Sequence, residues 1–440
     1  MNRYNRLKTL TLLLAASMLS ACGILPTIEP PVPPSSPTLT PTLARTPTPP
    51  PTPTEKVIQG TITLWYSWED PYAPALLRRI AAFQKLYPEV QFDVLYVPEL
   101  DLRGSFEAAA AEGGGPTLLI GPAEWGPPLY DRGWLAEMNP PSDLLNTLNP
   151  AAVQAGRYKD VLVGLPLHIK GVVLYRNKTI IPKAPASFEE LVNLSKAATQ
   201  GDVVGADLDR GFFFSAGHLY GLGGKLMTPD GAPAFNSDKG VEWLNLLSAF
   251  DQAGPTEYFT DNDLNLFKAG RIGFIIDGTW NRKDLADAIG SDNLAIDQWP
   301  LYGDGSLSGF VQSENIFLTA QAHGEDQMVS EMFAEFLLSP ESQNALAEVG
   351  YIPAINASPV NPAYTKLDIP DSLVFQAMQA MVDGAAYPIN PELSLYTSPM
   401  DIALKSVFYE GVAPSQALQT AFDAISEAVS NAHATSTPTP

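Results

Sequence analysis

A single stretch, residues 161–178, constrains the fold of this chain more than any other. It reads VLVGLPLHIKGVVLYRNK, which is largely apolar and β-branched, is interrupted by Gly164 and Pro166, and ends in a polar Arg-Asn-Lys group. Such a run predicts a strand that is buried on both faces and bent near its start. Strands of this kind are typical of α/β proteins, in which helices cover both faces of a sheet.

Two polar side chains, His168 and Lys170, lie inside this apolar run. A lysine surrounded by hydrocarbon needs a partner, a water-filled cleft or a path by which its ammonium reaches solvent. Two interpretations of Lys170 stay open. Its side chain extends to solvent at a strand end, or it faces a crevice where the strand passes between two lobes. For His168 we expect a strand histidine whose hydrogen bonds are satisfied locally, not a ligand group.

Residues 1–21 predict an export signal. Basic residues precede an apolar core, Leu10–Leu19, which is too short for a membrane-spanning helix of ~20 residues. The core leads into Leu-Ser-Ala-Cys-Gly around Cys22, which resembles the lipobox at which bacterial lipoproteins are cleaved and acylated. We therefore expect lipid attachment at Cys22. The alternative is an ordinary signal peptide that ends near a cysteine.

The exported chain begins with a predicted tether, residues 22–57. This segment is rich in proline, threonine and serine, a composition that cannot bury a core. The tail 433–440 has the same bias, and we expect it to be disordered. We expect the protein to be held by lipid at the cell surface or at the periplasmic face of a membrane.

Charge and cysteine content exclude several classes of function. The 440 residues include 26 basic and 48 acidic side chains, for a net charge of −22. This excess argues against nucleic-acid binding and against electrostatic docking on anionic lipid. Cys22 is the only cysteine, so neither an intrachain disulfide nor a thiolate metal site can form. The length is sufficient for two or more domains.

Polar and aromatic residues follow the carboxyl ends of three predicted strands. An alternating strand, Thr61–Tyr66, a helix stopped by Pro88 and a second strand form a β-loop-α-β unit of an open parallel sheet. In such sheets ligands bind beyond the carboxyl ends of the strands. For each tryptophan in that position, core packing is the alternative. The residues concerned are Ser67, Trp68 and Glu69 after the first strand, Glu124 and Trp125 after Thr117–Ile120, and Trp280 after Ile272–Ile276.

Several segments, in order, resemble the extracellular solute-binding proteins of ABC importers, and most of all their maltose and maltooligosaccharide binders. The resemblance runs from about Thr61 to about Val429. It implies an α/β fold of the two-lobe periplasmic-binding-protein type (class II), each lobe an open, mainly parallel sheet with flanking helices. The segments are TITLWYSW, FQKLYPEVQFDVLYVP, GPTLLIGPAEW, VGLPLHIKGVVLYRNK, FKAGRIGFIIDGTW, FAEFLLSPESQNALAEVGYIPA and YPINPEL.

The resemblance also implies lobe boundaries and a hinge. The N-terminal lobe would comprise residues 58–168 and 302–349, and the C-terminal lobe residues 169–301 and 350–432. Ligand would lie between the lobes, which close on it. The chain would cross between them near Ile169–Val172, Pro300–Tyr302 and Gly350–Pro353.

The site implied by the resemblance suits sugars, because aromatic rings pack on their C–H faces while carboxylates accept bonds from hydroxyls. Besides the residues after the strand ends, it includes an aromatic pair, Phe213 and Phe214. For this pair, as for the tryptophans, packing is the alternative. The implied ligand-binding residues are Ser67, Trp68, Glu69, Glu124, Trp125, Phe213, Phe214 and Trp280.

Three positions depart from the maltose-type pattern. Lys170 and Gly211 stand where those proteins have ligand-contacting glutamates. Thr397 stands where they have a tryptophan platform, and Tyr396 is the nearest aromatic. These departures argue against a plain maltodextrin as the ligand.

The charge of Lys170 leaves two classes of ligand open. If the lysine points into the cleft unpaired, it favours a carboxylated or otherwise anionic ligand. If it pairs with Glu124 or Glu314, a neutral sugar is favoured. Because the whole chain is strongly acidic, we expect the neutral sugar.

We therefore expect a membrane-anchored, monomeric protein that captures a sugar and delivers it to the permease subunits of an ABC importer. The alternatives are a tethered sensor or adhesion module on the same fold and a binder of an anionic solute or amino acid. A glycoside hydrolase needs two carboxylates at a fixed separation, and no segment singles out such a pair. No cofactor or metal is expected, because Asp207–Gly211 lacks the full acid set of a calcium loop.

Overall fold

Two long strands, β6 (Leu165–Asn177) and β12 (Phe310–Leu318), lie side by side and antiparallel at the centre of the fold. The computed structural model describes residues 57–255 and 262–436, which belong to one unit, Lys56–Pro440. The other strands are β1 (Gly60–Tyr66), β2 (Val90–Tyr96), β3 (Leu118–Pro122), β4 (Arg157–Tyr158), β5 (Val161–Leu162), β7 (Val204–Asp207), β8 (Ile272–Gly278), β9 (Leu294–Asp297), β10 (Leu301–Tyr302), β11 (Gly305–Ser306), β13 (Ile352–Pro353) and β14 (Ala385–Ala386).

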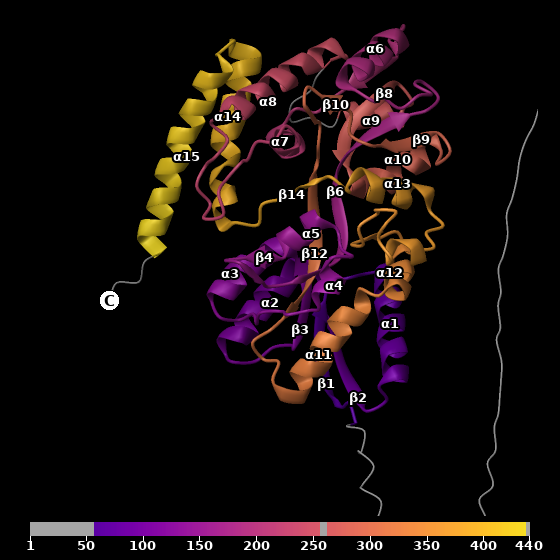
Figure 1. Cartoon of the computed structure of the whole chain (residues 1–440), viewed down its shortest axis with the longest axis vertical. Coiled ribbons are helices and arrows are strands. Elements are labelled where there is room, and N and C mark those ends of the chain that lie inside the picture. The colour runs from indigo at the N-terminus through magenta and orange to yellow at the C-terminus, as the bar shows by residue number, and fades with distance from the viewer. Residues whose placement is uncertain (1–56, 256–261, 437–440) are drawn as a thin grey trace, which may run out of the picture. The chain divides into compact units, whose positions relative to one another are not determined.

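The central strands connect two groups of strands, in the order β2-β1-β3-β12-β6-β8-β7 (Figure 1). We call β1, β2 and β3 the first group, and β7, β8 and β9 the second group. Strand β1 is parallel to β2 and β3, and β7 is parallel to β8. However, β12 is antiparallel to β3, and β6 is antiparallel to β8 and β9. The predicted two-lobe α/β class is confirmed, but the sheet is mixed rather than mainly parallel, because the connecting strands run against their neighbours.

Helices cover both faces of the strands (Figure 1). Several begin at capping residues recognisable in the sequence, such as Ser187, whose side chain accepts a bond from the Glu190 amide. The helices are α1 (Tyr72–Leu86), α2 (Glu99–Ala111), α3 (Gly126–Asp131), α4 (Ser142–Leu145), α5 (Pro150–Ala155), α6 (Phe188–Ala198), α7 (Phe212–Gly221), α8 (Asp238–Ala249), α9 (Asn262–Lys268), α10 (Arg282–Ile289), α11 (Gly324–Leu337), α12 (Pro340–Ala347), α13 (Ser372–Ala380), α14 (Thr397–Glu410) and α15 (Pro414–Ser436).

The apolar run in β6 is explained by cores on both of its faces. Val172 and Leu174 belong to a core that includes residues of α7, α8 and α14. Val173 and Tyr175 belong to a second core that includes residues of α9 and α13. Because successive side chains of a strand point to opposite faces, a strand between two cores has no polar alternation.

The polar end of that run is also buried, which the sequence did not indicate. Arg176 and Asn177 have 6% and 1% of their surface exposed. Arg176 Nε donates to Asp297 Oδ2 at 2.7 Å and Nη2 donates to Asp297 Oδ1 at 3.0 Å. This two-bond ion pair ties β6 to β9 and compensates the buried charges.

The predicted export signal, Cys22 and residues 22–56 of the predicted tether lie outside the described residues. Helix α15 continues through Ser436, into the segment predicted to be a disordered tail, and residues 437–440 again lie outside. Within residues 57–255 and 262–436, no helix is both long and apolar enough to cross a membrane.

Candidate functional site

A strip of four polar side chains lies where β6 and β12 cross between the two groups of strands. Lys170 pairs with Gln312, and His168 pairs with Glu314. Directly paired residues of an antiparallel ladder point to the same face of the sheet. In β12 the alternation is visible as burial, since Gln312 and Glu314 are half-buried while the residues on either side are buried.

Glu314 is held by Trp68, which follows β1, and by His168 of β6. Its Oε2 accepts a hydrogen bond from Trp68 Nε1 at 2.9 Å and lies 2.5 Å from His168 Nε2. The ring of Tyr351 stacks on His168, with centroids 3.8 Å apart, and lies 4.8 Å from Trp68. Burial, followed by the Glu314 charge, raises the pKa of the Tyr351 hydroxyl above its usual value. Trp68 is therefore a buried element of this cluster, with its indole N–H already used.

The second group contributes an aromatic wall. Trp280 follows β8 and keeps 46% of its surface exposed. Its ring covers Gly278, where a Cβ would lie 2.0 Å from the ring. Phe213, in the first turn of α7, lies 6.0 Å from Trp280 and 5.8 Å from Tyr387 between ring centroids. Trp280, Phe213 and Tyr387 therefore form one continuous set of rings, which we call the aromatic wall.

The aromatic wall adjoins the polar strip through β6. The backbone N–H of Gly171, next to Lys170, donates to Thr279 Oγ1 at 3.1 Å, and Thr279 precedes Trp280. Burial, followed by the Glu124 carboxylate, raises the pKa of the Tyr387 hydroxyl. The exposed Glu124 of the first group is thus within electrostatic reach of the wall.

A cavity of about 340 Å³ opens beside the wall. The predicted aromatic pair, Phe213 and Phe214, belongs to its lining together with Tyr387. Asp209 and Asp401 add two carboxylates, and the rest of the lining is Gly211, Phe212, Phe310, Leu393 and Thr397. Such a mixture of rings and a few carboxylates fits a ligand with apolar faces and hydroxyl groups.

Lys170 is exposed in the middle of the polar strip. Among residues 57–255 and 262–436, no hydrogen bond or ion pair is made by its ammonium group. Of the two pairings that would favour a neutral sugar, neither is made within the described residues. Glu314 bonds to Trp68 and His168 instead, and Glu124 makes no ion pair with Lys170. The expectation of a locally satisfied His168 agrees with its contact to Glu314.

Two predicted site residues are not brought to this site. Tyr396 is fully buried, and its hydroxyl donates to the Gly231 carbonyl at 2.8 Å. Trp125 is 9% exposed and packs back onto β3, where a Cβ on Gly121 would lie 2.4 Å from its ring. Both rings therefore belong to the core, the alternative that we set against ligand contact for Trp125.

The remaining predicted residues lie after β1. Ser67 is half-buried, and Glu69 is exposed. Glu69 Oε1 accepts a hydrogen bond from the Tyr96 hydroxyl at 2.7 Å. This bond orients Glu69 at the carboxyl end of the first group of strands, where ligands of such sheets bind.

No ligand role was predicted for Tyr351 or Tyr387, which the structure brings into the site. Tyr351 precedes β13, whose Ile352 pairs with Ile169 of β6. The only sequence signal was that both tyrosines lie within the segments GYIPA and YPINPEL that carried the family resemblance.

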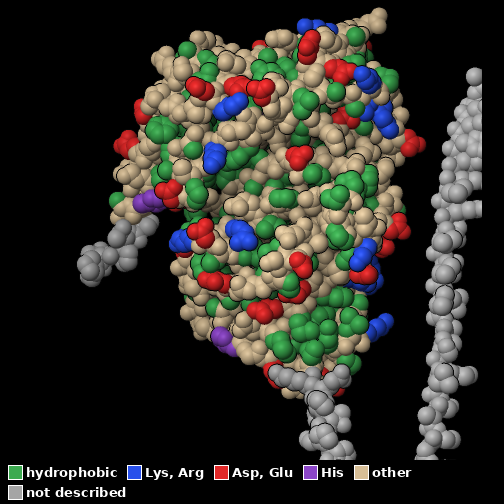
Figure 2. All heavy atoms as spheres, viewed as in Figure 1, with side chains coloured by type: hydrophobic (Ala, Val, Ile, Leu, Met, Phe, Trp, Pro, Cys, Tyr) green, Lys and Arg blue, Asp and Glu red, His purple; other side chains and the backbone are tan. Residues whose placement is uncertain are grey.

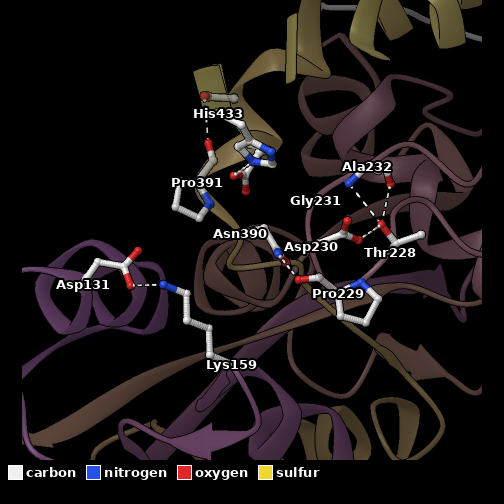
Figure 3. A network of polar contacts seen from close by, with 12 residues as sticks. Asp131, Lys159, Thr228, Pro229, Asp230, Gly231, Ala232, Asn390, Pro391 and His433 are labelled. Carbon is white, nitrogen blue, oxygen red and sulfur yellow. Dashed lines mark hydrogen bonds and ion pairs between the residues drawn. The ribbon is translucent and has the colours of Figure 1, made fainter. Parts of the chain in front are cut away.

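A second cavity, of about 400 Å³, also has Tyr387 in its lining. Figure 3 shows polar contacts around it: Lys159 Nζ binds Asp131 Oδ1 at 2.5 Å, and Asn390 Nδ2 donates to the Pro229 carbonyl at 2.9 Å. Arg157 and Lys225 also belong to its lining. Within the described part of the chain, no group of three or more His, Cys, Asp or Glu side chains is arranged to hold a metal ion.

The comparisons with known proteins agree with this architecture. Residues 78–369 match the model of the bacterial extracellular solute-binding proteins. Because the match covers more than half of the chain, this protein belongs to that family. It is similar to the galactooligosaccharide-binding protein of Bacillus subtilis, with 25% identity over 80% of this chain and 86% of the relative.

Two further proteins extend the comparison. A maltooligosaccharide ABC transporter solute-binding lipoprotein of Streptococcus pneumoniae is 25% identical over 42% of this chain and 46% of its own length. The solved structure of an extracellular solute-binding protein from Staphylococcus aureus in complex with maltose matches with a TM-score of 0.74 and 19% identity, over 85% of this chain and 98% of that one. At this identity the structural match establishes the fold alone.

Proposed function

We propose that this protein binds an oligosaccharide between its two groups of strands and delivers it to the permease of an ABC importer. The observation that carries the proposal is the polar strip on β6 and β12 next to an aromatic wall with an exposed Trp280. A sugar needs both surfaces, because rings pack on its C–H faces and charged or amide groups bind its hydroxyls. The names of the relatives, which bind galactooligosaccharides and maltooligosaccharides, support the same class of ligand.

Closure of the two groups on the ligand is part of the proposal. Two predicted crossings, near Ile169–Val172 and Gly350–Pro353, are adjacent, since β13 pairs with β6 at Ile169 and His168. Neighbouring connections of this kind support a hinge, because they can bend together while the cores on either side stay packed. The lobe boundaries predicted from the sequence stay part of this proposal.

The proposed role is binding without catalysis and without a cofactor. The family and the similar proteins are binding proteins. Glu314, the carboxylate of the polar strip, already accepts a hydrogen bond from Trp68 and contacts His168. Attachment through a lipid on Cys22 is also proposed, and the name of the streptococcal relative, a lipoprotein, supports it.

A titration of the purified protein with malto- and galactooligosaccharides tests the proposal. We expect saturable binding by at least one neutral or acidic oligosaccharide. Trp280→Ala should weaken it about tenfold, because an exposed ring that stacks on a sugar is worth about 1–2 kcal/mol. Phe375→Ala, which removes a partly exposed ring outside the aromatic wall, should leave the affinity unchanged.

Small-angle scattering with the same ligand checks the closure. The radius of gyration should fall on saturation and should not change with a sugar that does not bind. Binding of amino acids alone, or an affinity that Trp280→Ala leaves intact, would contradict the carbohydrate proposal.

A further inference from the structure

We infer that the ligand of this site is an acidic oligosaccharide, one that carries carboxylate or comparable anionic groups, and that Lys170 selects it. The inference rests on the proposed function, because it requires a sugar between the two groups of strands. It goes beyond that function by naming the charge of the ligand and the residue that recognises it.

The backbone of Lys170 is fixed at the crossing. Ile169 on one side is 1% exposed. Gly171 on the other side donates its N–H to Thr279 Oγ1, and a Cβ there would lie 2.5 Å from the Phe310 carbonyl oxygen. The backbone of the strand is therefore tightly packed on both sides of Lys170. Its exposed side chain starts from a fixed point on β6, next to the residue that binds Thr279.

The ammonium of Lys170 is left without a counter-charge by its neighbours. Its cross-strand partner, Gln312, is neutral. The carboxylate one pair further along, Glu314, already receives Trp68 Nε1 and contacts His168 Nε2 through the same oxygen, Oε2. Within residues 57–255 and 262–436 no carboxylate lies within ion-pair distance of Lys170. An exposed lysine needs no such partner while water surrounds it.

A bound ligand changes the hydration of the Lys170 ammonium. A ligand that covers Lys170 removes water from its ammonium, and an ammonium that is dehydrated and unpaired is strongly disfavoured. A neutral sugar offers only hydroxyl oxygens in compensation, whereas a carboxylate offers charge-assisted hydrogen bonds that are roughly twice as strong. The site therefore favours an anionic group on the sugar opposite Lys170.

Long-range attraction does not explain such a preference. The chain has a net charge of −22, and Asp and Glu side chains are scattered over the face shown in Figure 2. This field disfavours the approach of any anion. Selectivity for an acidic sugar must therefore arise at short range, from a contact such as the one that Lys170 offers.

The test compares ligands that differ only in charge. Oligogalacturonates and oligoglucuronates of two to four residues are titrated calorimetrically beside their methyl esters, which keep the ring and lose the charge. At least one acid should bind about tenfold or more tightly than its ester. Lys170→Met should abolish the difference, and Lys170→Arg should retain most of it.

Matched controls make the outcomes distinct. Lys196→Met removes an exposed lysine of α6 and should preserve the acid preference. Equal binding of acid and ester by the wild type, or a preference that survives Lys170→Met with an unchanged unfolding midpoint, overturns the inference but leaves the carbohydrate proposal intact. If neither these ligands nor neutral malto- and galactooligosaccharides bind, the proposed function fails, and this inference fails with it.

Discussion

His218 in α7 has no exposed surface and lies among Phe250, Trp299 and other core residues. Its Nδ1 lies 2.6 Å from the Ser308 carbonyl oxygen, and Nε2 has no hydrogen-bond partner among the described residues. Burial lowers the pKa of this histidine to about 4, while the Ser308 carbonyl acts in the opposite direction. The imidazole is therefore neutral in the folded protein across the pH range in which a free histidine becomes charged.

The lowered pKa of folded His218 predicts that this residue destabilises the folded protein in mild acid. Between pH ~6.5 and the folded pKa of about 4, His218 is protonated in the unfolded chain but stays neutral in the folded chain. The contribution of His218 to the free energy of unfolding should therefore fall as pH decreases through this window, by up to ~1.4 kcal/mol per pH unit. Buried Asp263, whose pKa is raised to about 8 by burial, acts in the opposite direction. Urea unfolding at pH 7 and pH 5 measures the effect.

The control for this prediction is another histidine. His218→Gln keeps a polar side chain near Ser308 and should remove the His218 part of the pH dependence, even if it lowers stability at pH 7. His323→Gln alters an exposed histidine before α11 and should leave the dependence unchanged. A change in stability between pH 7 and pH 5 that is the same in His218→Gln as in the wild type would contradict the burial argument.

At the scale of elements, two glycines show how differently a helix and a central strand respond to one methyl group. Gly104 is exposed inside α2, and nothing lies within 4 Å of a Cβ built there. Gly104→Ala should raise the free energy of unfolding by about 0.5–1 kcal/mol, because alanine is the better helix former.

Gly171 of β6 provides the opposite case. A Cβ there would lie 2.5 Å from the Phe310 carbonyl oxygen and 2.8 Å from Met381 Sδ. Gly171→Ala should therefore destabilise the protein, by about 1–3 kcal/mol. Thermal unfolding of both variants tests the pair, and equal midpoints for the two would show that β6 is less tightly packed than described.

For the molecule as a whole, the proposed attachment to a membrane depends on a segment that lies outside the described residues. The Leu-Ser-Ala-Cys-Gly sequence around Cys22 predicts acylation, and several acyl chains at ~0.8 kcal/mol per buried CH₂ would hold the protein firmly. Cys22→Ala should move the protein out of the membrane fraction or block its processing. Ser20→Ala, which keeps the cysteine, should not. Membrane retention of Cys22→Ala with an unchanged processed N-terminus would refute the lipoprotein assignment.

The sequence by itself determined the elements and their order. The alternation in β1 and β2, the three-to-four spacing in α1 and the apolar run of β6 are local patterns, and each reports which faces of an element are buried. Together with the ordered family segments they were sufficient for the fold class. They also located Trp280 and Glu69 after strand ends, because the carboxyl edge of a sheet follows directly from its strands.

Only the tertiary structure decided which of the candidate side chains meet. His168 and Glu314 are 146 residues apart in sequence, and their contact depends on the register between β6 and β12. The same register leaves Lys170 opposite the neutral Gln312, and no carboxylate of the described residues forms an ion pair with it. Trp125 and Tyr396 stand at positions predicted to contact ligand, but their rings are buried in the core. Tyr387, for which no role was predicted, belongs to the aromatic wall. Local periodicity specifies whether a face is buried, but not what lies opposite it, since the partner comes from a distant part of the chain.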